Sequence, residues 1–163
     1  MSRPKIVSLA LSALVALGGC DDGPSAPTPP IPSVAGTYYA TWQLQFRRNH
    51  DGFSGSFQCY GTVTLAQTPA RDNTATLNGF AVVGGPCPAQ SFDLRGTMEL
   101  SGAVRITTGA PRPPQGQCPG ATAAQYEGVV TERDLALRAS LDVNCPGPGE
   151  GMHRWDVIIT AGR

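Results

Sequence analysis

Apolar and polar residues alternate with a period of two through most of the chain after residue 36. From Tyr38 to Phe46 every second residue is apolar, and the residues between them are polar or amphipathic. A period of two places successive side chains on opposite faces of a β-strand, so each such segment is expected to be half-buried. The pattern recurs between turn residues at 57–65, 74–83, 92–100, 104–106, 124–131, 135–143 and 155–159. It predicts about eight antiparallel strands.

The abundance of turn-forming residues favours the same fold class. Gly and Pro account for 20 and 15 of the 163 residues, which disfavours a helical bundle. Strands with one apolar face each must share an interior, in either an up-and-down barrel or a two-sheet β-sandwich. Glycines inside the expected strands favour the barrel, because its closure needs sharp strand bends; they are Gly61, Gly79, Gly96 and Gly128. We therefore expect an all-β antiparallel up-and-down barrel of about eight strands, with the sandwich as the alternative.

The first twenty residues have the features of an export signal. Arg3 and Lys5 precede an apolar run over residues 6–17, which is too short to span a bilayer. The run ends in Leu17-Gly18-Gly19-Cys20, an aliphatic residue, two small residues and a cysteine, which resembles the lipobox of bacterial lipoproteins. The resemblance implies attachment of a diacylglycerol to the Cys20 sulfur, cleavage before Cys20 and acylation of the new amino terminus.

These features divide the chain into three parts. Residues 1–19 are the expected signal peptide, residues 20–35 the lipidated cysteine and a proline-rich tether, and residues 36–163 the β-barrel domain. Five prolines between residues 24 and 32 favour polyproline II geometry, which makes the tether a semi-rigid spacer. The chain is expected in the bacterial cell envelope, held to a membrane by the lipid on Cys20; the choice between inner and outer membrane stays open.

A second resemblance concerns the barrel itself. Gly36-Thr37-Tyr38 opens a long strand near the start of the domain, and the last expected strand carries Arg154. This is similar to the lipocalin pattern, in which a Gly-x-Trp at the first strand is covered by a late arginine. Tyr38 stands here in the tryptophan position, and Arg154 has the opposite parity from Trp155, so it is expected to point outward. The resemblance implies a lipocalin-like barrel architecture.

Four cysteines lie in the expected barrel domain: Cys59, Cys87, Cys118 and Cys145. In an exported chain they are expected to form disulfides. Their spacings of 28, 31 and 27 positions do not fit compact zinc motifs, so the sequence predicts neither a metal site nor a cofactor. Of the three possible pairings we favour Cys59–Cys87 with Cys118–Cys145, since the two pairs resemble a loose repeat of one hairpin pair each.

The sequence predicts no catalytic residues, and hence no enzyme. His50 adjoins Asp51 in an expected turn without a recognisable nucleophile motif. Asp93 and Glu99 share the outward parity of their strand, so they are expected to be solvated rather than paired across a site. Lys and Arg together number 12, as do Asp and Glu, with no block of like charge, so nucleic acid is not an expected partner.

Two functions remain open at this point. In the first, the chain is an envelope protein with a filled core and a structural or protein-interaction role, and the outward-facing Tyr39, Tyr60 and Arg47 form its candidate surface patch. In the second, the barrel binds a small apolar ligand, as lipocalin-like barrels can. The bulky inward side chains favour the filled core, because eight strands enclose little more space than side chains fill.

One long connection is expected to remain outside the packed domain. Residues 109–120 are rich in Pro and Gly and contain no aliphatic side chain larger than Ala110. We expect this segment to be the most mobile part of the folded domain and, if the barrel holds a ligand, to serve as its lid.

The lipobox makes a direct prediction. Replacing Cys20→Ser removes the sulfur that accepts the diacylglycerol, so the chain should accumulate as a precursor that is neither lipidated nor cleaved. Mass spectrometry of the membrane-extracted wild type should find a mature chain that begins at an acylated Cys20. A wild-type chain that still begins at Met1 would contradict the assignment.

Overall fold

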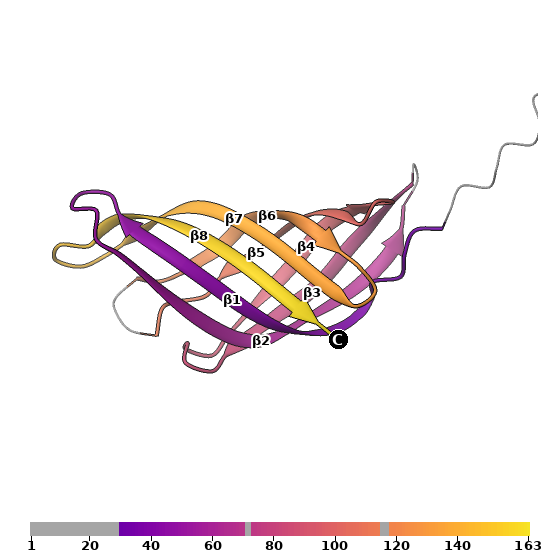
Figure 1. Ribbon diagram of the computed structural model, residues 1–163, viewed down its shortest axis with the longest axis horizontal. Coiled ribbons are helices and arrows are strands. Elements are labelled where there is room, and N and C mark those ends of the chain that lie inside the picture. Colours follow the sequence, from indigo (N-terminus) through magenta and orange to yellow (C-terminus); the bar gives the residue numbers. More distant parts are fainter. Residues whose placement is uncertain (1–29, 71–72, 115–117) are drawn as a thin grey trace, which may run out of the picture.

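The computed structural model describes residues 30–70, 73–114 and 118–163 of the chain. Eight antiparallel strands pair in sequence order, and β8 pairs back with β1 to close a barrel (Figure 1). The strands are β1 (Gly36–Arg48), β2 (Ser54–Pro69), β3 (Thr74–Gly84), β4 (Gln90–Glu99), β5 (Ala103–Ala110), β6 (Ala121–Val130), β7 (Asp134–Cys145) and β8 (Gly151–Gly162). The predicted up-and-down barrel is thus confirmed over the sandwich. Among the residues described, none belongs to a helix long and apolar enough to cross a membrane.

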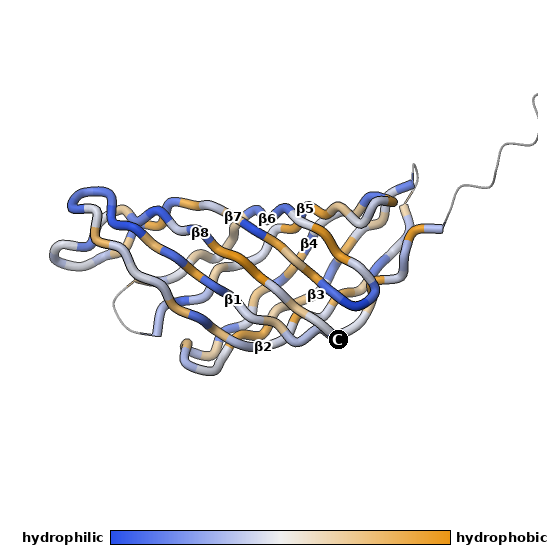
Figure 2. Tube along the Cα trace, in the orientation of Figure 1, coloured by the Kyte–Doolittle hydropathy of each residue, from blue (hydrophilic) through white to orange (hydrophobic). Residues whose placement is uncertain are grey.

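Alternate side chains of every strand enter one shared core. Figure 2 shows apolar and polar residues alternating along the strands, and the apolar set is the buried one. The largest fully buried side chains include Trp42, Trp155, Tyr38 and Tyr126. Of the bulky residues expected to face inward, four are only partly buried and pack against the rim of the core: Phe46, Phe57, Phe92 and Leu141.

The glycines expected to permit closure lie where neighbouring backbones approach closely. A Cβ at Gly61 would collide with the carbonyl oxygen of Val82 on β3, and a Cβ at Gly128 with that of Ala136 on β7. A side chain at either position would force two hydrogen-bonded strands apart. The glycines are therefore needed for close contact between strands in this barrel.

The barrel has two different ends. At the tether end lie the start of β1, the end of β8 and the connections β2–β3, β4–β5 and β6–β7; at the disulfide end lie the other four connections. β1 and β2 form twelve residue pairs, but β4–β5 and β6–β7 form four each, all near the tether end. The wall is therefore continuous near the tether end, and the β5–β6 hairpin separates from both neighbours toward the disulfide end.

The expectation that residues 109–120 remain outside the packed domain was wrong for residues 109–113, whereas the expected mobility and lid role stay predictions. Gly109 and Ala110 belong to β5, and Ala110, Pro111 and Pro113 are buried. The backbone N–H of Arg112 donates a hydrogen bond of 2.7 Å to the side-chain oxygen of Gln90. Proline rings are themselves apolar, so this segment packs across the disulfide end although it lacks large aliphatic residues.

Candidate functional site

The lipidation site expected at Cys20 lies outside the described residues, together with the signal peptide and most of the tether. The other residues singled out in the sequence lie in the described barrel.

The disulfides join the pairs that the sequence favoured, Cys59–Cys87 and Cys118–Cys145, with Cα–Cα distances of 5.4 Å and 4.4 Å. Cys59 is in β2 and Cys87 in the β3–β4 connection, whereas Cys118 is in the β5–β6 connection and Cys145 ends β7. The second bond therefore spans the region where β6 and β7 no longer pair. Both bonds hold connections of the disulfide end against long strands.

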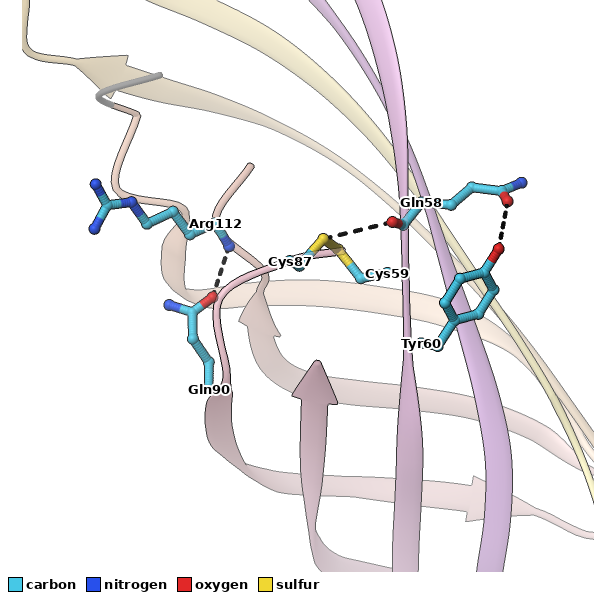
Figure 3. The surroundings of a disulfide bond; sticks show 6 residues. All are labelled: Gln58, Cys59, Tyr60, Cys87, Gln90 and Arg112. Atoms are coloured by element: carbon cyan, nitrogen blue, oxygen red, sulfur yellow. Dashed lines mark hydrogen bonds between the residues drawn. A yellow bond between two sulfur atoms is a disulfide. The ribbon is translucent and has the colours of Figure 1, made fainter. Parts of the chain in front are cut away.

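Figure 3 shows the surroundings of the first disulfide. The Cys87 sulfur lies 3.5 Å from the backbone oxygen of Gln58; a disulfide sulfur carries no proton, so this is a packing contact and not a hydrogen bond. On the outer side of the strand the Tyr60 hydroxyl donates to the Gln58 side-chain oxygen at 3.2 Å. The neighbourhood holds no ionisable group in contact with the sulfurs among the residues drawn, which suits a structural role.

The second disulfide lies beside a buried histidine. One ring nitrogen of His153 and the sulfurs of Cys118 and Cys145 all lie within 4.8 Å of one another, and all three residues are buried. His153 faces inward from β8 next to Cys145, because its register partner Val143 is two residues before Cys145. The imidazole stacks on the Phe46 ring at a centroid distance of 5.5 Å. The spacing of the cysteines along the chain gave no sign of this cluster, since His153 joins it across two strands.

Near the tether end, the Arg163 side chain contacts the residues that lead into β1. We call this set of contacts the clasp. Its guanidinium carbon lies 4.4 Å from the centroid of the Tyr38 ring, a cation–π contact. Its Nη2 lies 2.9 Å, 2.6 Å and 2.9 Å from the Val34 carbonyl, the Ala35 carbonyl and the Tyr38 hydroxyl oxygen. Two N–H protons are thus shared among three acceptors. Burial raises the pKa of the Tyr38 hydroxyl above its usual value of 10.0, and the charge of Arg163 partly offsets the rise.

This clasp also fixes the last residues of the tether. Val34 is fully buried, its N–H donates to the Gln67 side-chain oxygen at 2.8 Å, and the Gln67 amide donates to the Pro32 carbonyl at 3.0 Å. The arginine that lies over the Tyr38 ring is Arg163. Arg154 points outward, as its parity predicted, and lies 3.3 Å from Asp142.

The interior of the barrel contains polar groups without hydrogen-bond partners. The indole N–H groups of Trp42 and Trp155 and the hydroxyl of Thr108 are buried and have no hydrogen-bond partner among the residues that the structure describes. Tyr126, in contrast, donates to the Gly109 carbonyl at 3.3 Å, and burial raises the pKa of its hydroxyl well above the usual range. A buried donor without a partner costs about 1–3 kcal/mol, so an acceptor at Trp42 or Trp155 would be stabilising.

The predicted surface patch is only partly assembled. Tyr39 and Tyr60 are exposed on neighbouring strands, where Tyr39 pairs with Thr62 and Tyr60 with Thr41, so the two tyrosines are diagonal neighbours. Arg47 lies eight residues beyond Tyr39, about 27 Å along β1, so it does not join them. Phe80 and Val82 of β3 do join them, because Val82 pairs with Thr62 and Phe80 with Thr64. These two were missed because the alternation over residues 74–83 was less regular than elsewhere.

The outer face over β1, β2 and β3 is also free of charge. β2 and β3 contain no charged residue, and in β1 the only ones are Arg47 and Arg48 at its disulfide end. Each of the other five strands carries at least one. We call the outward side chains of Thr37–Gln45, β2 and β3 the uncharged face. Its large members, Tyr39, Tyr60, Phe80 and Val82, are 42–75% exposed.

A groove of about 730 Å³ lies over β6, β7 and β8. Most of its lining side chains face outward, among them Glu127, Val129, Arg138, Asp156 and Ile158. It is thus a depression in the outer wall where β6 and β7 part, and not the interior chamber that a lipocalin-like ligand would occupy.

The residues considered for acid–base chemistry are dispersed. His50 lies 3.7 Å from Asp51 in the exposed β1–β2 turn. The Phe53 backbone N–H and the nearby Arg48 guanidinium hold the pKa of Asp51 below its usual value, so this carboxylate is a stable part of the turn. Asp93 and Glu99 are exposed on β4, as expected. The absence of catalysis stays a prediction.

Comparisons with protein-family models, with curated proteins and with solved structures return no match to this chain.

The clasp generates a stability prediction. Arg163→Met keeps a long apolar side chain but removes the charge over Tyr38 and the donors to Val34 and Ala35, so it should lower the free energy of unfolding by about 1–3 kcal/mol in urea titrations. Arg154→Met is the matched control: it removes an exposed pair with Asp142 and should change stability by less than about 0.5 kcal/mol. If the two substitutions lowered the free energy of unfolding equally, the clasp would contribute no more to stability than an exposed ion pair.

Proposed function

We propose that the chain is a lipid-anchored lipoprotein of the bacterial cell envelope whose disulfide-bonded barrel docks onto another protein through the uncharged face. The lipobox at Leu17–Cys20 supports the anchor, and the four cysteines support export to an oxidising compartment. The observation that carries the docking role is the coincidence of exposed aromatic side chains with a lack of charge on three neighbouring strands, apart from Arg47 and Arg48 at the disulfide end of β1.

This coincidence matches the composition of protein interfaces. The centre of an interface is depleted of charged residues and enriched in aromatic ones, and Tyr in particular presents a large rigid area with a polar tip. On a surface that only meets water, charged side chains are ordinary, and β4 to β8 carry them on their outer sides. The Thr, Ser, Gln and Asn residues around the aromatic group add hydrogen-bonding capacity at the rim.

The partner surface is expected to be uncharged in its turn. A charged group pressed against this face would lose hydration and meet no opposite charge, which is unfavourable. The face also runs along the side of the barrel rather than across an end, so a partner would approach a tethered domain laterally.

Site-specific photo-cross-linking in cells tests this role. A benzophenone amino acid is placed in the full-length chain at Tyr39 or Phe80 and, as a matched control, at Val129, which is similarly exposed but lies on β6, outside the uncharged face. The first pair should give a discrete cross-linked protein, and Tyr60→Ser with Val82→Ser should reduce its yield at least fivefold. Identical products from both faces, or none from the uncharged face, would overturn the proposal; a product of twice the chain's mass would identify the partner as a second copy.

The unpaired indole N–H groups favour a second candidate function, binding of a small, mostly apolar ligand that carries an acceptor. The chain has two tryptophans, and both are buried inside the barrel, so their fluorescence reports on the interior alone. If this function holds, a long-chain fatty acid should quench that fluorescence saturably, and Trp155→Phe should weaken the binding. An unchanged emission spectrum up to millimolar ligand would contradict this second function and leave docking as the one remaining candidate.

A further inference from the structure

We propose that Cys118, Cys145 and His153 form a zinc site when a dithiol reduces the bond between the two cysteines. The inference is independent of the docking role, because the cluster lies at the disulfide end and within the core, away from the outer face of β1, β2 and β3. It also goes against the sequence-based expectation of no metal, which considered only the spacing of the cysteines.

The geometry of the cluster is close to that of a metal site. The two sulfurs and a ring nitrogen of His153 lie within 4.8 Å of one another, and the residues come from β7, β8 and the β5–β6 connection. In a tetrahedral zinc site with Zn–S of about 2.3 Å and Zn–N of about 2.0 Å, neighbouring ligand atoms are roughly 3.5–3.8 Å apart. Freed from their covalent bond, the sulfurs need only side-chain rotation to reach that separation.

Within the described part of the chain, the Nε2 atom of His153 has no hydrogen-bond partner. His153 is buried, with only 4% of its surface exposed, and its Nε2 makes no hydrogen bond to a described residue. A carboxylate oxygen of Glu150 lies 3.0 Å from Nε2, but not in hydrogen-bonding alignment. The stacked Phe46 ring fixes the plane of the imidazole. A buried, oriented imidazole with a ring nitrogen near two sulfurs is a donor set that zinc prefers.

Glu150 lies beside the histidine but outside the group of ligand atoms that are within 4.8 Å of one another. Its Oε2 lies near His153 Nε2 and 4.0 Å from Arg48 Nη1, so the carboxylate is shared between the imidazole and a guanidinium. Two thiolates and a neutral imidazole leave one tetrahedral position, which a water would take. The nearby Arg48 charge limits the affinity for a cation.

The redox step is an ordinary thiol–disulfide exchange. A dithiol passes two electrons and two protons to the Cys118–Cys145 bond: the S–S bond breaks, two thiols form, and the dithiol becomes a disulfide. Zinc then displaces the two thiol protons to solvent and binds both sulfurs as thiolates. Since the oxidised pair cannot coordinate as thiolates, metal binding and the disulfide exclude each other.

The other disulfide provides an internal comparison. Among residues 30–70, 73–114 and 118–163, the cluster around His153 is the one group of three His, Cys, Asp or Glu side chains close enough to hold a metal ion, and neither Cys59 nor Cys87 belongs to it. Reduction of Cys59–Cys87 should therefore release two thiols without creating a site.

Cobalt titration of the full-length chain in detergent tests the proposal. After reduction with a phosphine and removal of oxygen, Co²⁺ should bind one per chain with thiolate-to-cobalt charge-transfer and tetrahedral d–d absorption, and Zn²⁺ should abolish both bands. The Cys59→Ala/Cys87→Ala variant should keep this signal, and Cys118→Ala/Cys145→Ala should lose it.

His153→Asn should raise the dissociation constant for Co²⁺ at least tenfold with an unchanged count of free thiols. Zinc should also slow reoxidation of the wild type by diamide, but not of His153→Asn.

A single substitution covers the case in which full reduction unfolds the barrel. Cys145→Ala leaves Cys118 as a free thiol beside His153 and keeps the other disulfide, so it needs no reductant; it should bind Co²⁺ weakly, and Cys118→Ala/Cys145→Ala should not. Equal binding by these two variants, equal binding by wild type and His153→Asn, or no thiolate–cobalt band in any folded form would overturn the proposal.

Discussion

The pairing of β8 with β1 is the interaction on which the rest of this molecule depends. It joins ten residue pairs across the largest separation in the chain and turns an open meander into a closed wall. The same register places Arg163 beside Tyr38 at one end and His153 opposite Arg48 at the other. The clasp over the tether is therefore a product of closure, and so is the stacking of Phe46 on the His153 ring. A sheet that stayed open at this seam would have neither contact.

Every neighbouring pair of strands is hydrogen-bonded near the tether end, and covalent bonds take over where the pairing of β6 with β7 stops. β6 and β7 share four residue pairs, and the Cys118–Cys145 bond rejoins their region at the opposite end. A disulfide stabilises the fold by restricting the unfolded chain. It can also hold a loop in place where two strands are not aligned for backbone hydrogen bonds. The disulfide end can thus keep packed connections, such as the buried prolines near Arg112, on a wall that is not continuous.

Local patterns predicted the fold well, because in a meander each strand pairs with its sequence neighbours. The period of two, the glycines at close approaches and the pairing of the cysteines all express relations between adjacent segments. The features that were missed are relations between distant ones. Arg163 lies 125 residues from Tyr38, and only closure makes them neighbours. His153 meets Cys118 across two strands, and Phe80 joins Tyr39 through β2. The packing of residues 109–114 was missed for a different reason, since proline was treated as a breaker and not as apolar surface.

The clasp also determines how the barrel responds to mechanical force. Any pull on the tether enters the domain at Val34 and the start of β1, where Arg163, Tyr38 and Gln67 hold the backbone. β1 runs away from that point between two long antiparallel neighbours, with twelve residue pairs to β2 and ten to β8. The load therefore acts along the strand and shears both ladders at once, instead of opening one pair at a time. Under tension the lifetime of the fold is set by the rate of that concerted rupture, and not by its equilibrium stability.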